Sequence, residues 1–166
     1  MTIKMQGEAS VYIDASPERV YELVTDIARM GEWSPECVGA DWAPGSDGPA
    51  VGAVFNGTNS RATNQWTTPN TVIAATPGEE FAWVVGTMDF RVTTWRYSFA
   101  PEGEGTRVTE SFELGKEEVG FTSMVLEAPP SERGAMVEAR RAQLVEDMKE
   151  TLARLKDVAE AMSTKS

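Results

Sequence analysis

The sequence contains no histidine and a single cysteine, and these two absences exclude the commonest catalytic and metal sites. Without histidine, neither Ser-His-Asp nor Cys-His catalysis can be built, and the usual zinc and non-haem iron sites lose their ligands. Cys37 has no partner for a disulfide within the chain and no histidine to activate its thiol, so we expect it to fill apolar space. We expect no metal ion and no cofactor. Any chemistry must therefore depend on carboxylates, Tyr, Arg, Lys, Ser, Thr or ordered water.

Basic residues are also scarce, with 15 Lys and Arg against 26 Asp and Glu, for a net charge of −11. The electrostatic field of this negative charge repels nucleic acid and anionic membranes. No apolar run approaches the ~20 residues of a membrane-spanning helix, and the first residues lack the basic-then-apolar order of a signal peptide. These features predict a cytoplasmic protein without a membrane span. Its expected partner is a neutral or cationic small molecule, or another protein, and not a nucleic acid.

The 166 residues fit one domain, 1–166, in which a strand is followed by short helices, a meander of strands and one long helix. Residues 6–14 predict the first strand, and Ser16-Pro17-Glu18 begins a helix with Ser as N-cap. Turn residues then separate six predicted strands, at 38–42, 53–60, 65–75, 79–86, 92–100 and 106–114. A short helix is expected over 117–127, ended by Pro129-Pro130. From Gly134 to about Met162, an apolar stripe predicts one long amphipathic helix.

The faces of the last two strands can be assigned from their alternation. Three aromatic residues of 92–100 alternate with polar ones: Trp95, Tyr97 and Phe99. A register that puts the apolar sets of both strands on one face sets Tyr97 opposite Glu110 and Trp95 opposite Phe112, across a four-residue loop. Glu110 then lies among aromatic side chains on the inward face. In the alternative register, Glu110 pairs with Arg96 on the outside.

Local motifs recur in order along nearly the whole chain: Ser16-Pro17-Glu18-Arg19-Val20-Tyr21, Met30-Gly31-Glu32-Trp33-Ser34-Pro35, Phe55-Asn56-Gly57-Thr58-Asn59 followed by Trp66, Pro77-Gly78-Glu79-Glu80-Phe81-Ala82-Trp83, Trp95-Arg96-Tyr97, Gly105-Thr106-Arg107-Val108-Thr109-Glu110 and Thr151-Leu152-Ala153-Arg154-Leu155-Lys156. With the order of elements, they resemble the START-like helix-grip superfamily, also called SRPBCC, and within it the polyketide cyclase/dehydrase-like branch. The resemblance implies an α+β fold in which a strongly bent antiparallel sheet of about seven strands surrounds a long C-terminal helix. The superfamily contains cyclases, lipid carriers and hormone receptors, so the resemblance is specific for the fold rather than for one function.

A strongly bent sheet cannot close tightly on one helix, and the cleft that remains is the kind of concave, mostly apolar space where small ligands bind. The alternative is that the same aromatic residues pack against one another in a solid core. The predicted ligand-binding residues are Trp33, Phe55, Trp66, Trp83, Trp95, Met136 and Arg140, and the predicted catalytic residues are Asn59, Tyr97 and Glu110.

Three functions fit these expectations. The first is binding of a lipid, quinone, polyketide or aromatic metabolite without changing it. The second is aldol cyclisation or dehydration, with Glu110 as acid or base at a raised pKa, Tyr97 and Asn59 as hydrogen-bond donors, and Arg140 holding a carboxylate. The third is a helper domain that docks on another protein through 115–133, which could also act as a lid.

Overall fold

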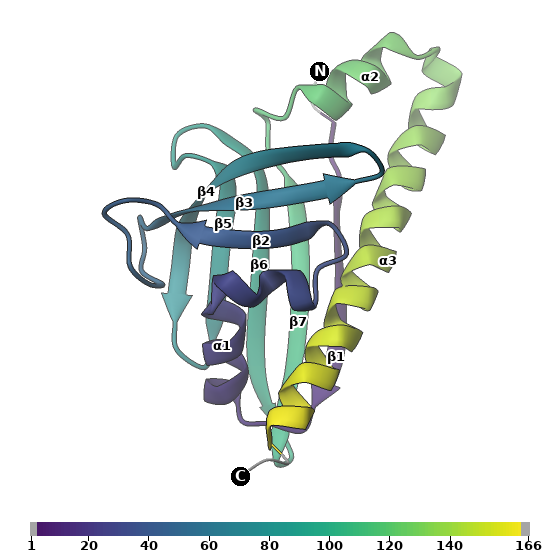
Figure 1. Cartoon of the computed structure of the whole chain (residues 1–166). Coiled ribbons are helices and arrows are strands. Elements are labelled where there is room, and N and C mark those ends of the chain that lie inside the picture. Colours follow the sequence, from purple (N-terminus) through teal and green to yellow (C-terminus); the bar gives the residue numbers. More distant parts are fainter. Residues whose placement is uncertain (1–2, 164–166) are drawn as a thin grey trace.

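The structure is a computed structural model that describes residues 3–163. Within these residues, seven strands form one antiparallel sheet in the order β1-β7-β6-β5-β4-β3-β2. The sheet curls around one long C-terminal helix (Figure 1), as the sequence predicts. In chain order the elements are β1 (Gln6–Ile13), α1 (Pro17–Thr25), the 3-10 helix η1 (Ile27–Glu32), β2 (Cys37–Trp42), β3 (Val54–Arg61), β4 (Asn64–Thr76), β5 (Glu80–Gly86), β6 (Arg91–Glu102), β7 (Gly105–Leu114), α2 (Gly120–Glu127) and α3 (Pro130–Ser163).

Two helix starts differ from the prediction. The long helix α3 begins at Pro130 rather than Gly134, because a proline in the first turn lacks only an N–H that would have no helical partner anyway. The short helix α2 begins at Gly120 rather than 117. The carboxylate of Glu118 stays outside the helix and accepts hydrogen bonds from the N–H groups of Phe121 and Thr122, both at 2.8 Å. None of the helices within residues 3–163 is long and apolar enough to cross a membrane.

The inward register predicted for the last hairpin is confirmed. Tyr97 lies opposite Glu110 and Trp95 opposite Phe112, whereas Arg96 lies opposite Ser111 and forms an ion pair with Glu80 of β5. The connection is shorter than the predicted four-residue loop, because its outer two residues already pair as Glu102 and Gly105. The predicted and the observed connection give the same register, so Glu110 lies on the inward face in either case.

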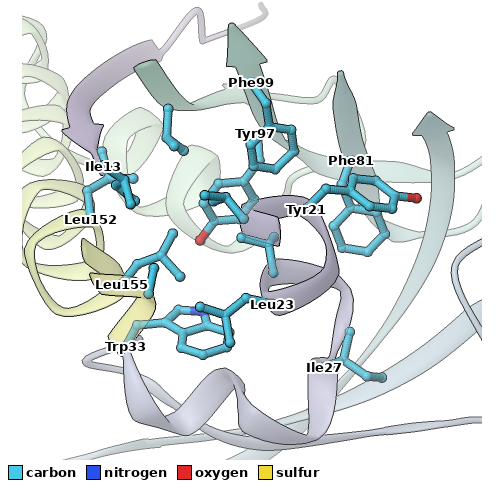
Figure 2. Close-up of a cluster of buried hydrophobic side chains, with 14 of the residues drawn as sticks. Ile13, Tyr21, Leu23, Ile27, Trp33, Phe81, Tyr97, Phe99, Leu152 and Leu155 are labelled. Carbon is cyan, nitrogen blue, oxygen red and sulfur yellow. The ribbon is translucent and has the colours of Figure 1, made fainter. Parts of the chain in front are cut away.

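One end of the concave face is filled by a packed core around α1. Ser16 caps α1 by accepting a hydrogen bond from the N–H of Arg19 at 3.2 Å. The apolar side of α1 then meets the sheet and the C-terminal half of α3, where Leu152 and Leu155 are buried. Figure 2 shows this cluster, with Trp33 of the segment after η1 beside Leu23 and Leu155.

The helix α3 lies along β1 and is hydrogen-bonded to the backbone near both ends of this strand. A Cβ atom on Gly7 would lie 2.9 Å from Cγ2 of Val145, so the missing side chain permits the close approach of helix and strand. The guanidinium of Arg141 donates a hydrogen bond to the carbonyl of Gln6 at 3.0 Å, and the ammonium of Lys156 donates to the carbonyl of Tyr12 at 2.8 Å. These contacts hold one side of α3 on the sheet edge and leave its other side facing the concave surface.

Candidate functional site

A cavity of about 440 Å³ lies between the concave face of the sheet and α3. One wall is aromatic and crosses four strands. The ring centroids of Phe55 and Trp83 are 5.7 Å apart, those of Trp83 and Tyr97 are 5.9 Å apart, and those of Trp95 and Phe112 are 5.6 Å apart. Leu144 and Met148 of α3 form part of the facing wall. These aromatic side chains pack against their neighbours along the sheet, in T-shaped or tilted pairs, and leave the space in front of them open.

Most of the residues that the sequence predicts for the site meet at this cavity. Its lining contains Phe55, Asn59, Trp66, Trp83, Trp95, Tyr97, Glu110 and Arg140. Trp33 is not in the lining, because the chain after η1 turns it into the packed core, where it is 1% exposed. Met136 is also outside the lining. It lies one helical turn before Arg140, which does line the cavity.

Glu110 is the most unusual polar residue of the cavity. Its side chain is 6% exposed, and its Oε2 atom is buried without a hydrogen-bond partner among residues 3–163. Burial raises the pKa of this carboxyl to about 8; a hydrogen bond from Tyr97 opposes the shift, and the negative charge of Asp147 adds to it. Glu110 is therefore protonated and uncharged at neutral pH.

The hydroxyl of Tyr97 donates a hydrogen bond to the Glu110 carboxyl across the strand pair β6–β7. Burial raises the pKa of Tyr97 well above its usual value of 10, and the neighbouring Glu110 raises it further. Tyr97 thus remains uncharged, and its hydroxyl hydrogen is used in the hydrogen bond to Glu110. The two side chains act as one unit, in which the Oε2 atom of Glu110 is buried and has no hydrogen-bond partner among residues 3–163.

A second polar group lines the cavity on β3 and β4. The amide nitrogen of Asn59 donates to the hydroxyl of Thr68 at 2.5 Å and to the carbonyl of Gly57 at 3.5 Å. Its two hydrogens are thus used within the protein, which leaves its carbonyl oxygen, and not a donor, for a ligand. Asn70 of β4 is a lining residue that was not predicted from the sequence; it is 5% exposed and pairs with Phe55 across β3 and β4. A polar residue across from a core aromatic was a signal that could have found it.

Three charged side chains from different elements meet beside the cavity, and we call them the rim clasp. The Nη2 atom of Arg61, at the end of β3, lies 3.0 Å from Oε2 of Glu36 and 3.2 Å from Oδ2 of Asp147 on α3. Both carboxylates are part of the cavity lining, and all three side chains are partly exposed. The rim clasp joins the segment before β2, the β3–β4 hairpin and the long helix.

The thiol of Cys37 lines the cavity as well. It is 8% exposed, its Sγ atom donates to the carbonyl of Gly39 at 3.2 Å, and burial raises its pKa. The thiol is therefore protonated and a poor nucleophile, in keeping with its predicted apolar role. Among residues 3–163, no cluster of three or more Cys, Asp or Glu side chains is arranged to hold a metal ion.

Several solved structures resemble this chain. The Polyketide_cyc-like protein Cgl2372 from Corynebacterium glutamicum is 33% identical to it, with a TM-score of 0.68, over 98% of this chain and 95% of its own. Two di-domain ARO/CYC proteins share the fold over about half of their own lengths. StfQ from the steffimycin biosynthetic pathway is 12% identical, with a TM-score of 0.74, over 98% of this chain and 52% of its own. BexL from the BE-7585A biosynthetic pathway is 22% identical, with a TM-score of 0.70, over 95% and 50%.

No curated protein matches the chain. The sequence model of the family described as polyketide cyclase / dehydrase and lipid transport matches residues 4–160, which is almost the whole chain. The chain belongs to the polyketide cyclase / dehydrase and lipid transport family.

Proposed function

We propose that the protein binds a small hydrophobic ligand in the cavity between the sheet and α3. The observation that carries this proposal is the 440 Å³ cavity itself, which the protein's own aromatic side chains line but do not fill. Its walls offer an apolar surface on which a ligand gains about 25 cal/mol for each Å² that it removes from water. A small set of polar groups, chiefly Glu110 and Asn59, lies on the same surface and can orient the ligand.

A blocking variant tests the proposal. Leu144 is a half-buried residue of α3 in the cavity lining, and Ala142, two positions earlier, is exposed. Leu144→Trp places a large ring in the cavity, whereas Ala142→Trp adds the same ring to the solvent side of the same helix. We expect a co-purified small molecule, detected by native mass spectrometry, in the unmodified protein and in A142W but not in L144W.

A thermal-shift screen of quinones, flavonoids, polyketides and fatty acids extends the test, because a ligand that binds only the folded state raises the melting temperature. Ligands that stabilise the unmodified protein should have no effect on L144W. The proposal is contradicted if no small molecule co-purifies and none of these classes shifts the melting temperature. A stoichiometric protein partner in place of a small molecule would instead favour a docking role.

A second candidate function is catalysis of aldol cyclisation or dehydration, and the protonated carboxyl of Glu110 favours it. In a dehydration, Glu110 would give its proton to the hydroxyl that leaves as water and would recover a proton from the carbon next to the substrate carbonyl. Tyr97 would hold the carboxyl in place during both transfers. A pKa of about 8 suits a group that must both give and take a proton near neutral pH.

Catalysis is tested with Glu110→Gln, which keeps the shape of the side chain but cannot transfer a proton. We expect turnover of an accepted substrate to fall by at least about 100-fold, with binding of that substrate retained. Activity of the unmodified enzyme should also decline above pH 8 as Glu110 loses its proton. Unchanged turnover in E110Q would leave ligand binding as the function and remove the acid-base role.

A further inference from the structure

We propose that a polar niche in the cavity wall binds a hydroxyl group of the ligand and selects hydroxyl-bearing ligands over those whose polar group only accepts hydrogen bonds. The niche consists of Gly57 and Asn59 of β3 with Thr68 and Asn70 of β4, and we call it the Gly57 niche. The inference rests on the proposed ligand-binding function and deepens it, because it names the ligand group that is recognised and the residues that recognise it.

The register of β3 and β4 brings the niche residues together on the inner face of the sheet. Three successive cross-strand pairs line the cavity: Phe55 with Asn70, Gly57 with Thr68, and Asn59 with Trp66. Gly57 is buried, and a Cβ atom added to it would lie 3.4 Å from Nδ2 of Asn70 and 3.8 Å from Sγ of Cys37, which are ordinary contact distances. The missing side chain therefore leaves room for a small group between the rings of Phe55 and Trp66.

Hydrogen bonds within the protein fix the orientation of the Asn70 side chain. Its amide nitrogen donates to the carbonyl oxygen of Thr68 at 3.0 Å and to that of Phe55 at 3.4 Å. Backbone carbonyls only accept hydrogen bonds, so the nitrogen and not the oxygen of the amide must face them. No group among residues 3–163 donates to the Oδ1 atom of Asn70. The amide oxygen is therefore the atom that Asn70 offers to a ligand.

Asn59 offers its amide oxygen in the same way, because its nitrogen donates to the hydroxyl of Thr68 and to the carbonyl of Gly57. Among the buried and half-buried residues of 3–163, only the Oε2 atom of Glu110 is a side-chain oxygen or nitrogen that is fully enclosed without a partner. The unbonded oxygens of Asn59 and Asn70 therefore keep accessible surface. Both residues line the cavity, so a ligand in the cavity can reach these two oxygens.

The hydroxyl of Thr68 completes the niche with a group that can donate. It accepts the hydrogen bond from Asn59 and keeps its own hydrogen. The Gly57 niche thus offers two acceptors and one donor. A ligand hydroxyl both donates and accepts, so it can pair with either kind of group. A ketone or ether oxygen only accepts, and a ligand that covers the niche with such an atom leaves both amide oxygens without a partner, which is unfavourable for buried polar groups.

Three matched probes separate a hydroxyl from other groups of similar size. They share a naphthalene ring: 2-naphthol carries a hydroxyl, 2-methoxynaphthalene an ether oxygen that only accepts, and 2-methylnaphthalene a methyl group without polar atoms. Isothermal titration calorimetry at pH 7, where 2-naphthol is uncharged, gives the dissociation constant of each probe for the unmodified protein and four variants.

The variants form two matched pairs. Gly57→Ala fills the niche with one methyl group at a position whose φ is not in the left-handed region, and Gly39→Ala on the neighbouring strand β2 adds a methyl group that meets no atom within 4 Å. Asn59→Leu removes one acceptor and keeps the size of the side chain. Asn56→Leu makes the same change on β3 at a residue that is not part of the cavity lining.

We expect the unmodified protein to bind 2-naphthol roughly fivefold more tightly than either other probe, which is the equivalent of about 1 kcal/mol for one net hydrogen bond. In G57A this preference should fall below about twofold, because the added methyl group covers the polar atoms of the niche. N59L should weaken the preference, because one of the two acceptors is lost. G39A and N56L should keep it.

Equal binding of 2-naphthol and 2-methoxynaphthalene to the unmodified protein would overturn the inference and leave ligand binding intact. An unchanged preference for 2-naphthol in G57A would overturn it in the same way. If N59L does not fold, G57A still gives the decision, since its methyl group makes only ordinary contacts. Binding of none of the three probes also overturns the inference, and the co-purification and thermal-shift results then decide separately whether the proposed function stands.

Discussion

The two ends of the concave face differ in what lies between the sheet and α3. At the end near α1, Tyr21, Phe81 and Phe99 pack edge to face, and Leu152 and Leu155 of α3 close the cluster. At the other end, rings of similar size line an open cavity. Both ends are built from alternating strands with aromatic residues on the inner face, so residue size does not explain the difference.

What differs is the presence of a middle layer. The helix α1 packs against β5, β6, β7 and α3, and thus occupies the space that the bent sheet leaves open. The short helix α2 contacts α3, and its Phe121 only borders the cavity. At the hollow end, therefore, no helix within residues 3–163 fills the space between the sheet and α3. The burial of α3 side chains shows the same difference between the two ends. Leu155 is fully buried near α1, whereas Leu144 is only half-buried beside the cavity.

The largest expected effect is the loss of packing at the filled end. Leu155→Ala leaves a void among close-packed side chains and should lower the free energy of unfolding by about 4 kcal/mol. Leu144→Ala removes the same atoms beside a space that is already empty and should cost no more than about 2 kcal/mol. Urea unfolding of both variants measures the difference, and equal losses would show that the two ends are packed alike.

The next largest effect is a dependence of the free energy of unfolding on pH, which comes from Glu110 at the hollow end. The pKa of Glu110 is about 8 in the folded chain and 4.5 as a free side chain, so between these values the folded state binds one more proton than the unfolded state. The stability that this proton provides is complete below pH 4.5 and is lost as the pH rises towards 8. From pH 5 to pH 7 the loss is about 3 kcal/mol.

Unfolding of the unmodified protein and E110Q across this pH range isolates the contribution of Glu110, because the other carboxyl groups are common to both. The stability of E110Q relative to the unmodified protein should rise with pH up to about 8 and then stay constant. Glu113→Gln, on the exposed face, should follow the unmodified protein. A difference that does not change with pH would mean that Glu110 is not buried in an uncharged form.

A smaller effect tests the link between Tyr97 and Glu110. The hydrogen bond from Tyr97 lowers the pKa of Glu110, so Tyr97→Phe should raise that pKa further and cost about 1 kcal/mol of stability. The carbonyl stretch of the protonated carboxyl, followed by infrared titration, measures the shift. Tyr21→Phe is the control, since Tyr21 is buried at the filled end, where its ring packs on Phe81 and Phe99. A lowered pKa in Y97F would contradict the hydrogen bond.

The smallest effect on stability is expected from the rim clasp. Arg61→Met breaks two partly exposed ion pairs, which should cost less than about 1 kcal/mol. We nevertheless expect a ligand identified in the thermal-shift screen to leave several-fold faster, because the β3–β4 hairpin is no longer tied to α3 beside the cavity. Stopped-flow release measures this rate, with Arg107→Met as control, since its ion pair with Glu102 lies at the hairpin turn before β7. Equal release rates would show that the rim clasp does not hold the cavity closed.

Much of the site could be predicted from alternation along single strands. The inward positions of Trp95, Tyr97, Glu110 and Phe112 follow from the two-residue period of a strand and from the hairpin register, and the structure confirms them. Trp33 was misplaced because it follows a helix and has no strand period to assign its direction. The rim clasp was missed because Arg61 and Asp147 are 86 residues apart, and only the fold brings them together.

The sequence by itself determined the order of the elements, the inner face of the sheet and the apolar stripe of α3, because each depends on periodicity within one segment. Its lack of histidine also excludes catalysis that depends on an imidazole of this chain. The tertiary structure alone decided that one end of the inner face is filled and the other hollow, and that Glu110 keeps an oxygen without a partner. Those outcomes depend on how far a bent sheet stands from its helices, which is a sum of packing contacts over the whole domain rather than a property of any local pattern.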